Sequence, residues 1–132
     1  MALPVVCRKV TPVLYVETIA PSLAFWRDRL GFAISAEVPG EGGPAFVILV
    51  GNGIELMLQT TASLAADPHA AGMSWRGDRS CLFVEVDDID ALAMALEGCE
   101  IVASRHETFY GATEIGYREP GGHFVTFAQF QR

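Results

Sequence analysis

The sequence lacks the features that mark membrane and nucleic-acid-binding proteins. Its longest apolar runs, such as 46–50, have the length of a strand, so we expect no signal peptide and no transmembrane helix. Lysine and arginine total only nine against sixteen acidic residues, giving a net charge of −7, and the nine are scattered. A basic stripe that would displace counterions from phosphates is therefore missing. We expect neither a membrane nor a nucleic acid as a partner.

Cysteine is also scarce. Three cysteines, Cys7, Cys81 and Cys99, are widely spaced and form no CxxC pair, so zinc and redox sites of that kind are excluded. This usage favours a reducing cytoplasm and buried thiols. Nucleophile-elbow, HExxH and P-loop motifs are absent as well.

The composition that remains describes one packed domain. The chain has 132 residues, of which 51% are hydrophobic and 19% charged. This length suffices for one sizeable core, and the composition excludes a disordered chain.

An internal duplication is the strongest pattern in the sequence. Residues 11–19 match residues 81–89 at an offset of about 70, with Val16 falling on Val86 and Ile19 on Ile89. Each copy alternates like a strand and then runs into a helical segment. The duplication therefore predicts two modules of the same plan.

Each module is expected to contain one helix. The first is predicted over 20–30, with Pro21 in its first turn and Gly31 as its stop. The second is predicted to begin at an Asp88 cap and to stop at Gly98.

Strand-like runs follow each helix, and the turn at 51–53 is a hairpin signal. We therefore predict an α+β fold in one domain over 1–132, with two βαβββ modules forming a curved mixed sheet around a cup and helices on its outer face. Module one covers about 9–60, a linker or pocket-covering loop 60–79, and module two about 80–130. The expected strands after the helices are 33–38, 45–50, 53–59, 100–103, 113–118 and 123–130.

Strand alternation separates two faces. Leu56 and Leu58 share a uniformly apolar face, which we expect to cover the helices, whereas Glu55, Met57 and Gln59 share the other. The mixed face, with aromatic and isolated polar side chains, is the kind of lining that small-molecule sites show.

Three segments, 13–32, 82–92 and 117–127, resemble the vicinal-oxygen-chelate superfamily of glyoxalases, bleomycin-resistance proteins and extradiol dioxygenases. The run SLAFWRDRLGF and the EPGG turn before the closing strand carry the resemblance. It implies paired βαβββ modules that form a cup, usually in a homodimer. Whether the cup forms within one chain or across the dimer is left open.

In the catalytic members that this chain resembles, up to four strand positions hold a divalent metal. These positions fall here on Thr11, Glu55, Cys81 and Thr126. Only Glu55 is a good ligand for a hard divalent ion, so we expect no metal and no cofactor. The histidines His69, His106 and His123 are expected in exposed loops. Glu85 and Glu114 are expected to be solvated at a sheet edge, and Arg118 to pair with Glu119.

The candidate site residues each have a functional and a structural interpretation. Glu55 is a pocket acceptor or general base, or else a solvent-facing strand residue. The aromatic candidates form a wall for a planar ligand, or else pack in the core or at a dimer interface. Cys81 is interpreted as a small buried residue. The predicted ligand-binding set is Thr11, Tyr15, Glu55, Met57, Trp75, Cys81, Phe83, Tyr110, Phe124 and Thr126.

The leading hypothesis is metal-independent binding or sequestration of a small aromatic or cationic molecule by a cytoplasmic homodimer, without catalysis. The alternative is a metal-dependent glyoxalase-like lyase, isomerase or dioxygenase that uses Glu55. A third hypothesis is a protein–protein interaction module that keeps the fold without a working pocket.

Overall fold

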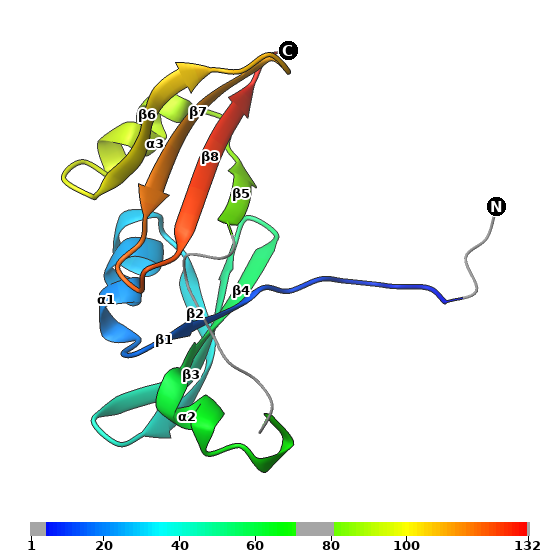
Figure 1. Ribbon diagram of the computed structural model, residues 1–132, viewed down its shortest axis with the longest axis vertical. Helices are drawn as coiled ribbons and strands as arrows, with labels where there is room; N and C mark the ends of the chain where they lie inside the picture. The colour runs from blue at the N-terminus through cyan, green and yellow to red at the C-terminus, as the bar shows by residue number, and fades with distance from the viewer. Residues whose placement is uncertain (1–4, 71–80, 132) are drawn as a thin grey trace.

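The computed structural model describes residues 5–70 and 81–131, which form two four-stranded sheets (Figure 1). The strand order is β1-β4-β3-β2 in the first sheet and β5-β8-β7-β6 in the second. No helix in the described parts of the chain is long and apolar enough to cross a membrane. The strands are β1 (Val13–Val16), β2 (Ala33–Gly40), β3 (Gly43–Gly51), β4 (Ile54–Thr60), β5 (Cys81–Glu85), β6 (Ile101–Glu107), β7 (Ala112–Arg118) and β8 (Phe124–Phe130).

The two sheets repeat one topology. The first strand of each module pairs in parallel with the last, β1 with β4 and β5 with β8, and the remaining pairs are antiparallel. The predicted α+β fold with two βαβββ modules is thus confirmed. The β3–β4 hairpin turns at Asn52 and Gly53, whose φ angles of 51° and 81° fit the tight two-residue turn indicated by the sequence.

The first helix begins at Ala20, as predicted. Its first part, α1 (Ala20–Leu23), continues into a π-helical segment, η1 (Ala24–Arg29), in which the Leu30 amide donates to the Phe25 carbonyl at 3.2 Å. Gly31 ends it with a φ of 82°. Phe25 and Trp26, on this widened turn, are both almost fully buried.

The second helix, α3 (Ile89–Ala95), begins with the predicted cap. The Asp88 carboxylate accepts hydrogen bonds from the amides of Asp90 and Ala91, which satisfies two donors that the helix itself leaves unpaired. Gly98, with a φ of 86°, follows its end.

The region between the modules begins with structure that the sequence did not indicate. A short helix, α2 (Thr61–Ala65), is capped by the Thr60 hydroxyl, which accepts from the Ser63 amide at 3.1 Å, and a 3₁₀ turn, η2 (Pro68–Ala70), follows. One and a half turns are too short to show a hydrophobic period, so the pattern resembled a loop. The rest of the predicted linker up to 79, with Trp75, lies outside the described residues.

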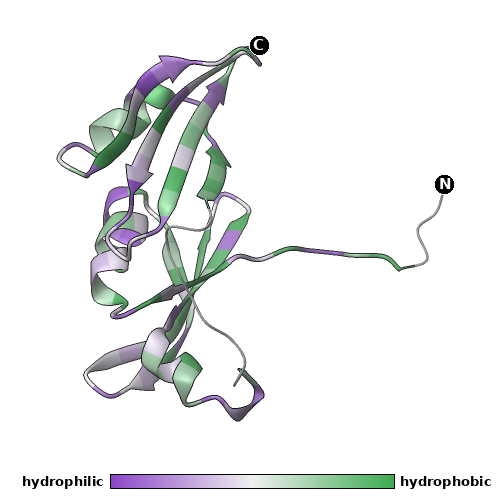
Figure 2. Cartoon of the chain, in the orientation of Figure 1, coloured by the Kyte–Doolittle hydropathy of each residue, from purple (hydrophilic) through white to green (hydrophobic). Residues whose placement is uncertain are grey.

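One hydrophobic core extends across both modules. It contains the inward strand residues Leu14, Leu56 and Phe127 together with Trp26 of η1 and Leu92 of α3. Figure 2 shows hydrophobic stretches in both sheets. The uniformly apolar strand faces do cover the helices, as predicted.

The β7–β8 turn of module two is anchored on module one. The His123 side chain, only 3% exposed, donates from Nε2 to the Tyr15 carbonyl at 2.8 Å. The backbone of Gly121 approaches so closely that an added Cβ would lie 2.4 Å from Cγ1 of Val16 and 2.9 Å from Oγ of Ser22. These contacts fix the position of one sheet relative to the other. The prediction of His123 as an exposed loop residue was therefore wrong.

Candidate functional site

The face of module one that lies away from the helices carries the predicted mixed set. Tyr15 and Met57 are half-buried there, whereas Leu56 and Leu58, which alternate with them, are fully buried. Because the register pairs Val13 with Met57 and Tyr15 with Gln59, this face is a continuous surface of β1 and β4.

Glu55 is the most strongly engaged of the predicted site residues. Its Oε1 accepts from the Thr11 hydroxyl at 3.0 Å and lies 2.6 Å from the Lys9 ammonium. The bond from Lys9, and after it the bond from Thr11, lower the pKa of the Glu55 carboxyl. Glu55 is therefore an ionised acceptor with two donors on one oxygen.

Lys9 was missed by the sequence analysis. Strand alternation could have indicated it. Lys9, Thr11 and Val13 are spaced two residues apart, so their side chains point to one face of an extended chain. The Met57 amide donates to the Pro12 carbonyl at 2.9 Å, which extends the pairing of β1 with β4 toward Lys9.

The other two positions that match metal ligands of the resembling family also form a pair. Cys81 Sγ lies 3.4 Å from Thr126 Oγ1 on the corresponding face of module two. Cys81 is exposed, so its interpretation as a buried apolar residue was wrong. Cys7 is exposed as well, and Cys99 is half-buried. Cys81 is the first residue of β5, in which exposed and half-buried residues alternate.

A hollow of about 430 Å³ between the modules brings residues of both to one place. Glu55 and Lys9 line it from module one, and Phe83 and Glu85 from module two. Trp26 and Phe32 form its apolar interior side, together with Leu56, Leu82 and Val84. Phe83 is 52% exposed, so a large apolar surface is available to a ligand beside a carboxylate.

Tyr110 belongs to a second polar group on module two. Its hydroxyl donates to Glu114, which is only 6% exposed and also lies 3.5 Å from His106 Nε2. The hydrogen bond to Glu114, followed by desolvation, raises the pKa of Tyr110. Glu114 was expected to be solvated and His106 to lie in a loop. Both predictions were wrong, because β6 extends to Glu107 and pairs His106 with Glu114.

Aromatic rings connect Tyr110 to the hollow. The ring of Phe130 lies 6.1 Å from that of Tyr110 and 6.2 Å from that of Phe83. Phe109 is fully exposed and makes an edge contact of 5.1 Å with Tyr110. Module two thus presents a row of aromatic side chains on its open face.

Phe124 is covered by a cation rather than open to a ligand. The Arg118 guanidinium lies 4.5 Å above its ring and binds Glu100 at 3.1 Å. The expected pairing of Arg118 with Glu119 was wrong, because Glu119 is buried against Trp26.

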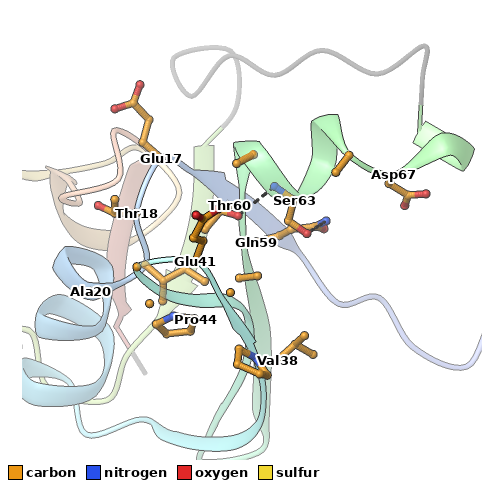
Figure 3. A pocket seen from close by; sticks show the side chains of 18 residues that line it. Glu17, Thr18, Ala20, Val38, Glu41, Pro44, Gln59, Thr60, Ser63 and Asp67 are labelled. Atoms are coloured by element: carbon orange, nitrogen blue, oxygen red, sulfur yellow. Dashed lines mark hydrogen bonds between the residues drawn. The ribbon is translucent and has the colours of Figure 1, made fainter.

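Two further hollows lie outside the predicted set. One, of about 630 Å³, lies between α2, the β2–β3 hairpin and the start of α1, and Glu17, Glu41 and Asp67 stand among its lining residues (Figure 3). The other, also about 630 Å³, occupies the equivalent place in module two, beside Asp87 and Arg105. Among the described residues, no member of the predicted ligand-binding set lines either hollow.

The donor chemistry does not fit a divalent metal. The four positions that match the family's metal ligands supply one carboxylate, one thiol and two hydroxyls, in two separate pairs. The Glu55 carboxylate is already ion-paired with the Lys9 ammonium. Within 5–70 and 81–131, no group of three or more His, Cys, Asp or Glu side chains is placed to hold a metal ion.

Comparisons with known proteins agree with this architecture. A family model described as Glyoxalase/Bleomycin resistance protein/Dioxygenase superfamily matches residues 9–127. A comparison with curated protein sequences gives no match.

Solved structures resemble the chain over nearly its whole length. A protein of unknown function from Agrobacterium tumefaciens str. C58 has a TM-score of 0.73 at 23% identity, covering 95% of both chains. TioX from Micromonospora sp. ML1 has a TM-score of 0.68 at 21% identity, covering 93% of this chain and all of its own. Lactoylglutathione lyase from Agrobacterium tumefaciens has a TM-score of 0.73 at 18% identity, covering 94% and 98%. At these identities the likeness shows the fold alone.

Proposed function

The chain belongs to the glyoxalase/bleomycin resistance protein/dioxygenase superfamily, and from this premise we propose that it binds a small molecule without a metal. The binding place is the hollow between the modules, bounded by Glu55 and Phe83. The observation that carries the proposal is the state of Glu55, whose Oε1 is held by Lys9 and Thr11. A carboxylate with two donors on one oxygen orients a polar ligand group, while Phe83 supplies apolar contact.

We also propose that the protein is a cytoplasmic homodimer. Val13 and Phe83 leave large apolar surfaces open on the faces away from the helices, and a second copy would cover them. The exposed free thiols of Cys7 and Cys81 support a reducing compartment. Sedimentation equilibrium tests the dimer, with an expected mass of twice the 14.2 kDa chain.

Elemental analysis and ligand screening test the binding function together. We expect purified protein to contain far less than one equivalent of Ni, Zn, Mn or Fe. We also expect at least one neutral aromatic compound to raise the melting temperature saturably, because a ligand that prefers the native state stabilises it.

Two results would favour the alternatives. A stoichiometric metal that is lost in Glu55→Ala would point to a metal-dependent lyase, isomerase or dioxygenase. The absence of any saturable shift across aromatic metabolites and planar antibiotics would favour an interaction module instead. Phe83→Ala provides the local control, because it should weaken a genuine ligand of this hollow while leaving the buried core intact.

A further inference from the structure

The Glu55 carboxylate is occupied by a cation that the chain itself supplies. Lys9 Nζ lies 2.6 Å from Glu55 Oε1, within the distance of a charge-assisted hydrogen bond. Thr11 donates to the same oxygen at 3.0 Å and so holds the carboxylate in place. The contact shows that one oxygen of the Glu55 carboxylate is open to a primary ammonium group.

The surroundings of the carboxylate favour an ammonium attached to an apolar body. Ile54 and Phe83, both substantially exposed, line the same hollow as Glu55, and Phe32 lies deeper in it. Glu85 adds a second acidic side chain to the lining. A volume of about 430 Å³ lies in the lower range of small-ligand pockets and matches a ligand built on one or two rings.

Lys9 is placed so that it can leave. Its side chain is 60% exposed, and residues 5–10 are all exposed. Figure 1 shows the described residues before β1, from residue 5 on, running outward, away from both sheets. Because exposed ion pairs contribute little free energy, a ligand with a better-fitting body can displace this one.

We propose that Glu55 is a receptor for the primary ammonium group of a small apolar amine, and that the Lys9 side chain is the intramolecular competitor which such a ligand displaces. This inference rests on the proposed binding function and names its ligand class. It also gives the segment before β1 a role, because residue 9 sets the affinity of the hollow for amines.

The test uses 2-phenylethylamine as the probe and 2-phenylethanol as its uncharged analogue, with dissociation constants measured by ligand-observed NMR on the full chain. In Lys9→Met we expect the amine to bind about threefold more tightly than in the unchanged protein, since a weak ion pair occupies the site only in part. The alcohol should bind equally to both. Adding Glu55→Gln to Lys9→Met should abolish the gain.

Arg8→Met is the matched control, because it removes the same charge from the neighbouring exposed position without vacating Glu55. An equal gain in Arg8→Met would overturn the proposal in favour of a general charge effect. Equal amine affinity in Lys9→Met and the unchanged protein would overturn it too. If the alcohol binds and only the amine gain is missing, the proposed function stands. If neither probe binds any variant, the proposal fails, and the screen of aromatic metabolites and planar antibiotics decides the proposed function.

A readout without ligand checks the pairing itself. The carboxyl NMR titration of Glu55 should move toward the ordinary pKa of glutamate in Lys9→Met and stay unchanged in Arg8→Met. An unchanged titration in Lys9→Met would show that Lys9 does not occupy the carboxylate, and would overturn the proposal independently of any probe.

Discussion

The indole N–H of Trp26 donates a hydrogen bond of 3.3 Å to the carboxylate of Glu119, and this bond joins the first helix of module one to the β7–β8 turn of module two. Glu119 is only 1% exposed, and its other oxygen accepts from the His123 amide at 3.3 Å. Two donors thus compensate a buried acidic group at the junction on which the hollow depends.

Glu119→Ala should therefore destabilise the whole domain. Losing the carboxylate leaves the Trp26 and His123 donors buried without this acceptor and opens space between the modules, so we expect a loss of about 3 kcal/mol in the free energy of unfolding. Urea denaturation measures it. Glu97→Ala, at an exposed position, is the control and should lie within about 0.5 kcal/mol of the unchanged protein. Equal effects of the two substitutions would contradict the role assigned to Glu119.

Gly121→Ala should be more harmful than Gly122→Ala, although Gly122 has the less favourable backbone. At Gly121 the new Cβ would stand 2.4 Å from a Val16 methyl group, whereas at Gly122 nothing lies within 4 Å and only the φ of 96° opposes the substitution. Overpacking against β1 is expected to cost about 3 kcal/mol, and the backbone strain about 1 kcal/mol. Thermal unfolding of both variants ranks them, and the reverse order would show that the turn is not pressed against β1.

The ion pair between Lys9 and Glu55 should make the free energy of unfolding depend on pH. Because the pKa of Glu55 is lowered in the folded chain, its ionised form contributes stability above the unfolded pKa, and this is lost as the pH falls through the folded value. The advantage of the unchanged protein over Glu55→Gln should therefore be complete near neutrality and shrink below pH ~4.5. Denaturant midpoints between pH ~3 and ~6 would show it. In a Lys9→Met background, the stability difference between Glu55 and Glu55→Gln should change less with pH, because the main cause of the lowered Glu55 pKa has been removed.

Much of the fold could be read from local patterns. The offset of about 70 residues, the Asp88 cap and the Asn52-Gly53 turn each act within a few residues, and each is present in the structure. The helix α2 escaped notice because five residues show no period. β6 was predicted too short, because its residues 104–107 include polar and charged side chains that are exposed at the sheet edge.

The candidate site was only partly accessible in this way. Alternation placed Thr11 beside Glu55 and Cys81 beside Thr126, because parity and register are local properties of paired strands. The burial of Glu119 and His123 depends on contacts between segments 93 and 108 residues apart. No spacing rule encodes such contacts, so these polar residues were assigned to the surface by their type alone.

Tyr110 offers the clearest spectroscopic prediction. The hydrogen bond to Glu114 raises the pKa of Tyr110, so its neutral form contributes stability below the unfolded pKa, and this contribution is lost as the pH rises through the folded value. Burial also raises the pKa of Tyr117. An alkaline absorbance titration of tyrosinate should therefore contain two late components, from Tyr110 and Tyr117, and Tyr110→Phe should remove one of them only. Glu114→Gln keeps the acceptor but removes its charge, so it should bring the Tyr110 component back toward pH ~10. A late component that survives Tyr110→Phe unchanged would show that the phenol does not share a proton with Glu114 in solution.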